Sequence, residues 1–296
     1  MKNFLERLRE GTLICDGAMG TMLMKNGMPV GVCPEEWGNV NKDILLSIHK
    51  DYLSAGSQII VSNTFGANRI KLSKFNLENK LEEINSLAIE IAKEAAAGKA
   101  YVFGDIGPTG EYLKPVGSIE LNEMIDVFTQ QVKILEKSGA DAIILETMTD
   151  LEELKAGIAA VKENTDLPLI VTMTFQKTQN SGFRTTSGNT VKQLLDTALS
   201  AGCDVVGTNC TLAIDEMSEI VREMRQLSPN AFIIAQPNAG MPKLSEGEAV
   251  YDQTPEEFSK GVPALISAGA NIIGGCCGTT PEFIKRINEI VIKITG

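Results

Sequence analysis

The sequence predicts an α/β protein of one domain, in which eight parallel strands and their helices close into a (β/α)8 TIM barrel. Short apolar segments alternate with longer segments of helical periodicity along the whole chain. The starts of the eight strand candidates lie about 37 residues apart, which accommodates a strand, a crossover helix and two loops. The strand candidates are apolar throughout, as expected where helices cover a parallel sheet. An open, doubly wound sheet is the alternative interpretation.

The predicted elements follow one another at regular intervals. The strands comprise residues 12–16, 58–62, 101–104, 142–146, 169–174, 204–208, 232–236 and 271–274. The helices comprise residues 41–55, 79–97, 121–139, 151–164, 190–201, 215–227, 255–268 and 281–294. Four helices end in small residues around Gly56, Gly139, Gly202 and Gly269, and glycine just beyond a helix ends it by adopting a left-handed conformation. Four similar helix ends indicate a repeated unit.

No feature of the sequence divides the chain into two domains. The turn Asp16–Gly20 after the first strand is too short for the GxGxxG fingerprint of dinucleotide-binding folds. No Pro/Ser-rich linker interrupts the alternation of strands and helices. Residues 1–296 are therefore expected to form one barrel domain.

The charge balance excludes several kinds of partner. The chain carries 27 Lys and Arg residues against 38 Asp and Glu residues, giving a net charge of −11. Nucleic acids and anionic membranes need a cationic surface, so neither is an expected partner. No apolar segment approaches the ~20 residues of a membrane span, and residues 1–10 lack the apolar core of a secretory signal. We therefore expect a reducing, cytoplasmic location.

The single histidine, His49, restricts the available chemistry. Ser-His-Asp and Cys-His catalysis, three-His zinc sites and two-His iron sites all need imidazoles that this chain lacks. His49 lies in a segment of helical periodicity, where we expect it at the surface. A metal site in this protein must therefore be built mainly from sulfur or carboxylate.

Three cysteines lie at predicted strand ends, where TIM barrels carry their active sites. Cys210 follows the sixth strand, and Cys276 and Cys277 follow the eighth. Adjacent side chains in a strand point to opposite faces, so two neighbouring ligands need an unusual backbone, which Gly274, Gly275 and Gly278 would permit.

The helix expected to start at Thr279-Thr280-Pro281 would favour thiolates nearby. A zinc site with an open fourth position follows from these three thiols. A structural zinc site, inert buried thiols or a strained vicinal disulfide are the alternatives. Cys15 reads as strand core, Cys33 as loop and Cys203 as a helix-to-strand junction, without an assigned role.

Two carboxylates also follow predicted strands. Asp16 precedes a glycine-containing turn, and Glu146 ends the fourth strand. A carboxylate at the barrel mouth needs a cation, so each is a candidate for a substrate ammonium group, the alternative being a helix cap. Asp105 precedes Gly107-Pro108, and a structural role is the favoured interpretation there.

Four motifs, in this order, resemble those of the zinc-dependent homocysteine S-methyltransferase family. They are Asp16-Gly17-Ala18-Met19-Gly20-Thr21, Ser62-Asn63-Thr64-Phe65-Gly66-Ala67, Gly207-Thr208-Asn209-Cys210 and Gly274-Gly275-Cys276-Cys277-Gly278-Thr279-Thr280-Pro281, with Pro237-Asn238-Ala239-Gly240 between the last two. The segments 63–68 and 104–110 look most similar to the homocysteine-binding module of bacterial cobalamin-dependent methionine synthases. The resemblance covers essentially the whole chain.

The resemblance implies a zinc-dependent methyltransferase that converts homocysteine to methionine. Zinc would be held by three cysteines, with the homocysteine sulfur as fourth ligand, and other residues would bind the amino-acid end of the substrate. The implied metal ligands are Cys210, Cys276 and Cys277. The implied substrate residues are Asp16, Gly17, Ala18, Met19 and Glu146, supported by Asn209 and Asn238. No acid/base residue is expected, because the zinc-activated thiolate is itself the nucleophile.

The methyl donor is expected to come from outside this chain. A corrinoid held by histidine needs a DxHxxG-type motif, and the residue two positions before His49 is Ser47. Methylcobalamin would therefore be presented by a corrinoid-binding protein or another domain, and the end of the chain after Ile294 fits either a subunit or part of a longer protein. The alternatives are S-methylmethionine or betaine as donor, another thiol or a selenol as acceptor, or a redox module with a vicinal disulfide.

Overall fold

The chain folds into a closed barrel of eight parallel strands, which confirms the predicted fold class. A computed structural model describes residues 2–179, 182–245 and 248–295. The barrel strands are β1 (Leu13–Ile14), β2 (Ile59–Val61), β3 (Tyr101–Ile106), β4 (Ala142–Met148), β5 (Leu169–Met173), β8 (Val205–Asn209), β9 (Phe232–Gln236) and β12 (Ile272–Ile273). They pair in the order β1-β12-β9-β8-β5-β4-β3-β2, and the parallel bridge between Cys15 and Ile59 joins the two ends.

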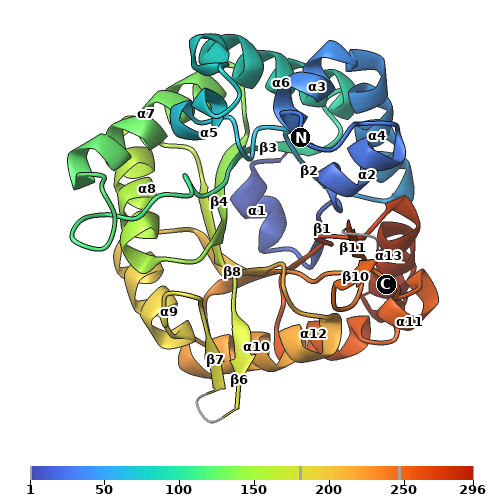
Figure 1. The fold of residues 1–296 in the computed structure, drawn as a ribbon. Helices are drawn as coiled ribbons and strands as arrows, with labels where there is room; N and C mark the ends of the chain where they lie inside the picture. The colour runs from blue at the N-terminus through green and yellow to red at the C-terminus, as the bar shows by residue number, and fades with distance from the viewer. Residues whose placement is uncertain (1, 180–181, 246–247, 296) are drawn as a thin grey trace.

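Side chains fill the barrel interior, and helix α1 (Phe4–Leu8) closes the end at which the strands begin. Alternate strand residues such as Leu13, Phe103 and Ile234 form one buried cluster inside the ring. Helix α1 lies at the centre of the ring in Figure 1. The ring of Phe4 packs edge-on against Tyr101 and Phe103, with centroids 5.5 and 5.0 Å away. With this plug beneath the strands, the opposite mouth is the end available for a site.

The helices form the outer layer seen in Figure 1 and include all those predicted. The long ones are α4 (Lys42–Ala55), α6 (Leu81–Ala96), α7 (Leu121–Lys137), α8 (Leu151–Asn164), α9 (Val191–Ser200), α10 (Ile214–Leu227) and α13 (Pro281–Thr295). The predicted helix 255–268 is instead two, α11 (Pro255–Ser259) and α12 (Val262–Ala268). They divide because Pro263 lacks an N–H and is tolerated only in the first turn of α12.

The helix ends follow the predicted glycines. The φ angles of Gly56, Gly139, Gly202 and Gly269 are 111°, 93°, 72° and 109°. Four short helices were not predicted, and they are α1, α2 (Met19–Lys25), α3 (Pro34–Val40) and α5 (Arg69–Ser73), while the predicted helix 79–97 begins with the 3-10 turn η1 (Glu78–Lys80). Helices this short carry too little periodicity to be seen in the sequence.

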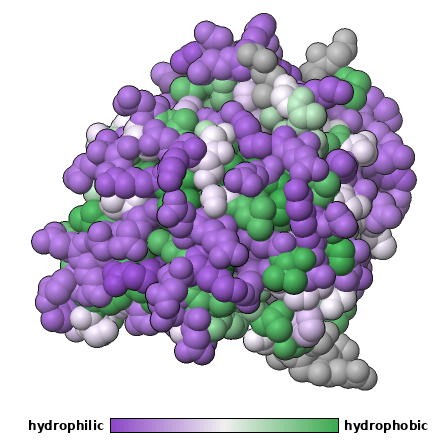
Figure 2. Space-filling model, turned by 90° about the horizontal axis from the view of Figure 1, so that it is seen from above, coloured by the Kyte–Doolittle hydropathy of each residue, from purple (hydrophilic) through white to green (hydrophobic). Residues whose placement is uncertain are grey.

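Two hairpins extend the loops after β5 and β9. The first pairs β6 (Gln176–Thr178) with β7 (Gly182–Arg184) and projects beyond the ring in Figure 1. The second pairs β10 (Lys243–Ser245) with β11 (Glu248–Val250). Figure 2 shows a side of the molecule that is largely hydrophilic with scattered apolar groups. Among the described residues, no helix combines the length and apolar character that a membrane crossing requires.

His49 is buried, so its predicted place at the surface is wrong. Its side chain is 0% exposed, because α4 is covered by α3, α6 and α13 and turns His49 inward together with Ile48 and Tyr52. Neither ring nitrogen has a hydrogen-bond partner. Burial lowers the pKa of His49 to about 4, so the imidazole is neutral in the folded protein at neutral pH.

Protonation of His49 is expected to destabilise the fold in acid. Its pKa of about 4 in the folded protein lies below the ordinary histidine value of 6.5, so its contribution to stability is present above pH 6.5 and is lost as the pH falls toward 4. Relative to the wild type, His49→Leu should gain about 2 kcal/mol in unfolding free energy on going from pH 8 to pH 5. Urea titrations at the two pH values measure this, and parallel pH profiles for the two proteins would contradict it.

Candidate active site

The three predicted cysteines meet at the C-terminal mouth of the barrel. Cys210 follows β8, while Cys276 and Cys277 follow β12. The Sγ atom of Cys277 lies 3.8 Å from that of Cys210 and 3.9 Å from that of Cys276, and all three sulfurs lie within 4.8 Å of one another. Tetrahedral zinc with Zn–S bonds of about 2.3 Å separates its sulfurs by about 3.8 Å. The donor set and its spacing therefore fit a zinc ion with one position left open.

Backbone hydrogen bonds to the loop after β9 hold the cysteines in place. The N–H of Cys210 donates to the carbonyl of Gln236 at 3.0 Å, and the N–H of Cys276 donates to that of Pro237 at 2.8 Å. The carbonyl of Cys277 accepts from the N–H of Ala239 at 2.9 Å. One loop thus sets the spacing between the ligands from β8 and those from β12.

The backbone around the cysteines departs from strand geometry. Strand β12 ends at Ile273, so the alternation of side chains does not apply to Cys276 and Cys277. Gly278 adopts a φ of 82°, and Cys210 a φ of 63°, which a residue other than glycine rarely adopts. Gly275 is needed for a different reason from the one predicted, since a Cβ there would lie 2.4 Å from the hydroxyl oxygen of Thr279.

The three thiols share their protons unequally. Hydrogen bonds from Cys210 and Cys276 lower the pKa of Cys277 to about 3. The bond to Cys276 lowers the pKa of Cys210, but the bond to Cys277 and burial outweigh it and raise that pKa to about 11. The bonds to Cys210 and Cys277, together with burial, hold the pKa of Cys276 well above its usual range. Before a metal binds, Cys277 is therefore the thiol of the three that ionises most readily.

Asp16 and Glu146 lie at the same mouth without a cation. Asp16 is 2% exposed and accepts the N–H of Val61 at 2.8 Å. Burial raises the pKa of Asp16 to about 7, and burial with repulsion from Asp16 and Cys277 raises that of Glu146 to about 8. In the described part of the chain, neither carboxylate forms an ion pair with a lysine or arginine. A ligand with an ammonium group would supply the missing charge.

Asp105 belongs to the same group of carboxylates, although the sequence favoured a structural role for it. Strand β3 continues through Asp105, leaving it 4% exposed with Oδ1 lacking a hydrogen-bond partner. Burial, followed by repulsion from Glu146, Glu35 and Asp16, raises its pKa well above the usual range. Lys71 opposes this shift. Three carboxyl groups therefore share the side of the mouth formed by β1, β3 and β4, where burial and mutual repulsion disfavour their charged forms.

Asn209 positions the chain beside Glu146. Its Oδ1 accepts from the N–H of Thr147 at 2.9 Å and from the hydroxyl of Thr172 at 2.8 Å, while its Nδ2 donates to the hydroxyl of Thr147 at 2.7 Å. These bonds hold Thr147 at a φ of 60°, where the register of β4 shifts. Asn238 is 1% exposed, and its Oδ1 has no hydrogen-bond partner.

The turn after β1 closely approaches residues 274–280, the loop after β12 that carries Cys276 and Cys277 and is called the metal loop below. Helix α2 begins at Met19, with Ala18 as its N-cap residue. The N–H of Ala18 donates to the hydroxyl of Thr279 at 3.1 Å, so this donor is already used within the protein. A Cβ at Gly17 would lie 2.7 Å from the same hydroxyl and 2.9 Å from the ring of Tyr52. Only glycine fits there, whereas the contacts of Thr279 and Tyr52 were not foreseen in the sequence.

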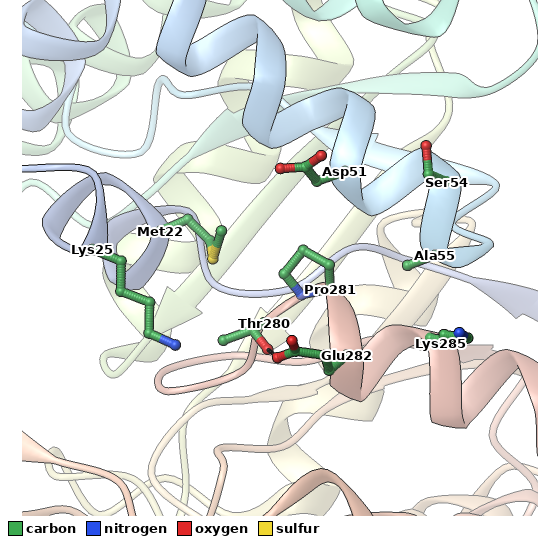
Figure 3. A pocket seen from close by; sticks show the side chains of 9 residues that line it. All are labelled: Met22, Lys25, Asp51, Ser54, Ala55, Thr280, Pro281, Glu282 and Lys285. Atoms are coloured by element: carbon green, nitrogen blue, oxygen red, sulfur yellow. Dashed lines mark hydrogen bonds between the residues drawn. The ribbon is translucent and has the colours of Figure 1, made fainter.

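A separate groove of about 500 Å³ lies on the outer wall (Figure 3). Its lining comes from α2, α4 and the start of α13 and includes Lys25, Asp51, Glu282 and Lys285. None of the predicted metal or substrate residues lines it. The groove is therefore distinct from the mouth.

Comparison with known proteins identifies the family. Residues 13–291 match the family model for homocysteine S-methyltransferase. The chain belongs to this family. Within the homocysteine S-methyltransferase family, it is 31% identical to the methionine synthase of Mycobacterium leprae and 30% identical to that of Mycobacterium tuberculosis. The matches cover 98% and 99% of this chain but 25% and 26% of those proteins. The chain thus spans about a quarter of the length of these curated relatives.

Solved structures show the same barrel. The metallated form of the homocysteine methyltransferase MmuM from Escherichia coli matches with a TM-score of 0.82 at 21% identity, covering 97% of this chain and 99% of that one. A methyltransferase from Methanosarcina mazei matches with a TM-score of 0.62 at 10% identity, covering 99% and 98% of the two chains. At these identities the likeness establishes the fold.

Proposed function

We propose that this chain is the homocysteine-activating unit of a methionine-forming methyltransferase, with residues 1–296 acting as one homocysteine-binding barrel domain. The observation that carries the proposal is the cluster of Cys210, Cys276 and Cys277, whose sulfur spacing suits tetrahedral zinc. The family match supports homocysteine as the methyl acceptor. A reducing, cytoplasmic compartment suits the site, because all three cysteines must remain thiols.

The residues around the cluster are arranged to bind an amino acid. Asp16 and Glu146 together would receive the ammonium group, whose charge relieves their mutual repulsion. We assign the substrate carboxylate to the backbone of the turn Gly17-Ala18-Met19, in which Gly17 precedes α2 and the N–H of Met19 has no acceptor within the helix. Asn209 supports Glu146 through Thr147, and Asn238 lies beside Pro237, which contacts the metal loop.

The chemistry required is the activation of one sulfur atom. A free thiol with a pKa of ~8.5 is only a few per cent ionised at neutral pH. Zinc held by the three cysteines would keep the substrate sulfur deprotonated and leave one coordination position for it. A sulfur lone pair then attacks the methyl carbon in line, the new S–C bond forms, and the electron pair of the broken bond stays with the donor.

We propose methylcobalamin, presented by another domain or a corrinoid-binding protein, as the donor. The similarity to methionine synthases about four times as long supports this choice. The chain's single histidine is buried in α4, which leaves no imidazole to hold a corrinoid. S-methylmethionine or betaine would be the donor in the alternative version of this proposal.

A donor screen tests the proposal. Zinc-loaded protein and homocysteine are incubated separately with methylcobalamin, S-methylmethionine, betaine and S-adenosylmethionine, and methionine is measured by mass spectrometry. We expect methylcobalamin to be used fastest. Methionine formed only from another donor would overturn the donor assignment, and no methionine from any donor would overturn the reaction. If the protein instead binds no metal when reduced and loses two hydrogens on mild oxidation, the redox alternative holds.

A further inference from the structure

The turn after β1 and the metal loop after β12 meet at a single buried hydroxyl group, that of Thr279. Thr279 is 0% exposed. Its Oγ1 accepts the N–H of Ala18 at 3.1 Å and donates to the carbonyl of Cys276 at 2.7 Å. One side chain therefore joins a residue of the proposed amino-acid subsite to a proposed metal ligand.

The packing leaves this hydroxyl little freedom. A Cβ on Gly17 would lie 2.7 Å from Oγ1, and a Cβ on Gly275 would lie 2.4 Å from it. Real Cβ atoms do not approach so closely, so both neighbours must be glycine for Thr279 to occupy this position. The hydroxyl is thus enclosed by the two loops that it joins.

Two further hydrogen bonds and a phenol shared by both connect the same two segments. The N–H of Gly275 donates to the carbonyl of Asp16 at 2.9 Å, and the N–H of Gly278 donates to the hydroxyl of Thr21 at 3.0 Å. The phenol of Tyr52 lies 3.2 Å from the carbonyl of Ala18 and 3.3 Å from that of Thr279, so it is shared between the loops. The loops therefore move as one unit, with Thr279 at its centre.

We propose that Thr279 is a positioning residue that couples the amino-acid subsite to the metal centre, so that zinc and the amino-acid part of the substrate bind cooperatively. This inference rests on the proposed function. A metal ion fixes Cys276, the carbonyl of Cys276 orients the Thr279 hydroxyl, and that hydroxyl fixes the N–H of Ala18 and the turn that holds Gly17. Because the coupling is a binding free energy, the amino acid must strengthen zinc binding by the same factor.

A substrate analogue without the thiol cannot bind zinc through sulfur, so any effect of zinc on its affinity reports the coupling alone. The probe is 2-aminobutyrate, which has the backbone of homocysteine but no sulfur. Calorimetry on zinc-free and zinc-loaded protein should show that zinc raises its affinity at least about fivefold. Competition with a chelator should show that saturating 2-aminobutyrate raises the affinity for zinc by the same factor. Both readouts are independent of turnover.

Variants of Thr279 separate coupling from general stability. Thr279→Val removes the hydroxyl with little change of shape and should reduce the coupling factor below about two, whereas Thr279→Ser should retain it. Thr208→Val is the matched control, because Thr208 is equally buried and its hydroxyl has no hydrogen-bond partner. It should keep the wild-type factor. If Thr279→Val does not fold, Tyr52→Phe, which releases the other shared contact, should at least halve the factor.

The measured coupling factors either support or overturn the role of Thr279. A wild-type factor below about two, or a wild-type factor retained by Thr279→Val or by Tyr52→Phe in its place, overturns the coupling even if methionine is still formed. Wild-type protein that binds neither 2-aminobutyrate nor homocysteine overturns the proposed function together with the coupling. Loss of coupling in Thr279→Val, restored by Thr279→Ser, supports the inference.

Discussion

Cys277→Ala is expected to abolish zinc binding and to reduce methyl transfer to homocysteine by at least about a thousandfold. The sulfur of Cys277 lies within 3.9 Å of both other sulfurs and is the central member of the cluster. Without the metal, only a few per cent of the substrate thiol is ionised at neutral pH, which accounts for about 30-fold or more. Loss of the orientation that the metal gives to the sulfur accounts for a similar further factor.

Metal analysis and turnover measurements check this expectation. The matched control is Cys203→Ala, since Cys203 is also a free cysteine but is buried at the junction before β8, away from the cluster. The control should lose about 1–2 kcal/mol of unfolding free energy and keep its zinc and its turnover. A zinc content near one per chain in Cys277→Ala would remove Cys277 from the ligand set.

The barrel was predictable because its signals are local and repeated. Each apolar strand and each helix of three or more turns leaves its own periodicity in the sequence, and a glycine beyond the helix marks its end. The cysteine cluster was predictable for a related reason, since strand ends of a barrel meet at one mouth. Cys210 and Cys276 could be brought together by topology alone, although 66 positions separate them.

The remaining features depend on contacts between distant segments. His49 has a sequence context like that of a surface residue, and only the packing of α3, α6 and α13 around α4 buries it. Asp105 joins the acidic mouth because β3 runs two residues beyond its predicted end. The bond between Ala18 and Thr279 spans 261 positions and involves one hydroxyl, which no periodicity records.

Glu146→Gln is expected to stabilise the protein and to lower its affinity for homocysteine. The pKa of Glu146, about 8 in the folded protein, lies above the ordinary glutamate value of 4.5, so its contribution to stability is present below pH 4.5 and is lost as the pH rises through 8. Glutamine remains neutral at every pH. Allowing for the partial exposure of Glu146, the variant should gain about 2 kcal/mol over the wild type at pH 8 and only about 0.4 kcal/mol at pH 5.

The same substitution removes one of two carboxylates proposed to hold the substrate ammonium. Losing a buried, charge-assisted hydrogen bond costs about 2–3 kcal/mol, so the KM for homocysteine should rise about 30- to 150-fold. The kcat should change little, because the ammonium group is held equally in the ground and transition states. Urea titrations at pH 5 and pH 8 and steady-state kinetics measure the two effects.

A gain in stability together with a loss of affinity distinguishes a binding role for Glu146 from a structural one. A carboxylate that merely stabilised the fold would, on replacement, lower stability and affinity together, whereas a binding-site carboxylate held beside Asp16 without a cation opposes folding until its ligand arrives. Glu163→Gln is the matched control, since Glu163 is exposed near the end of α8 and should change neither quantity. If Glu146→Gln destabilises the protein at pH 8, the acidic pair is part of the scaffold, and the ammonium group of homocysteine must be bound elsewhere.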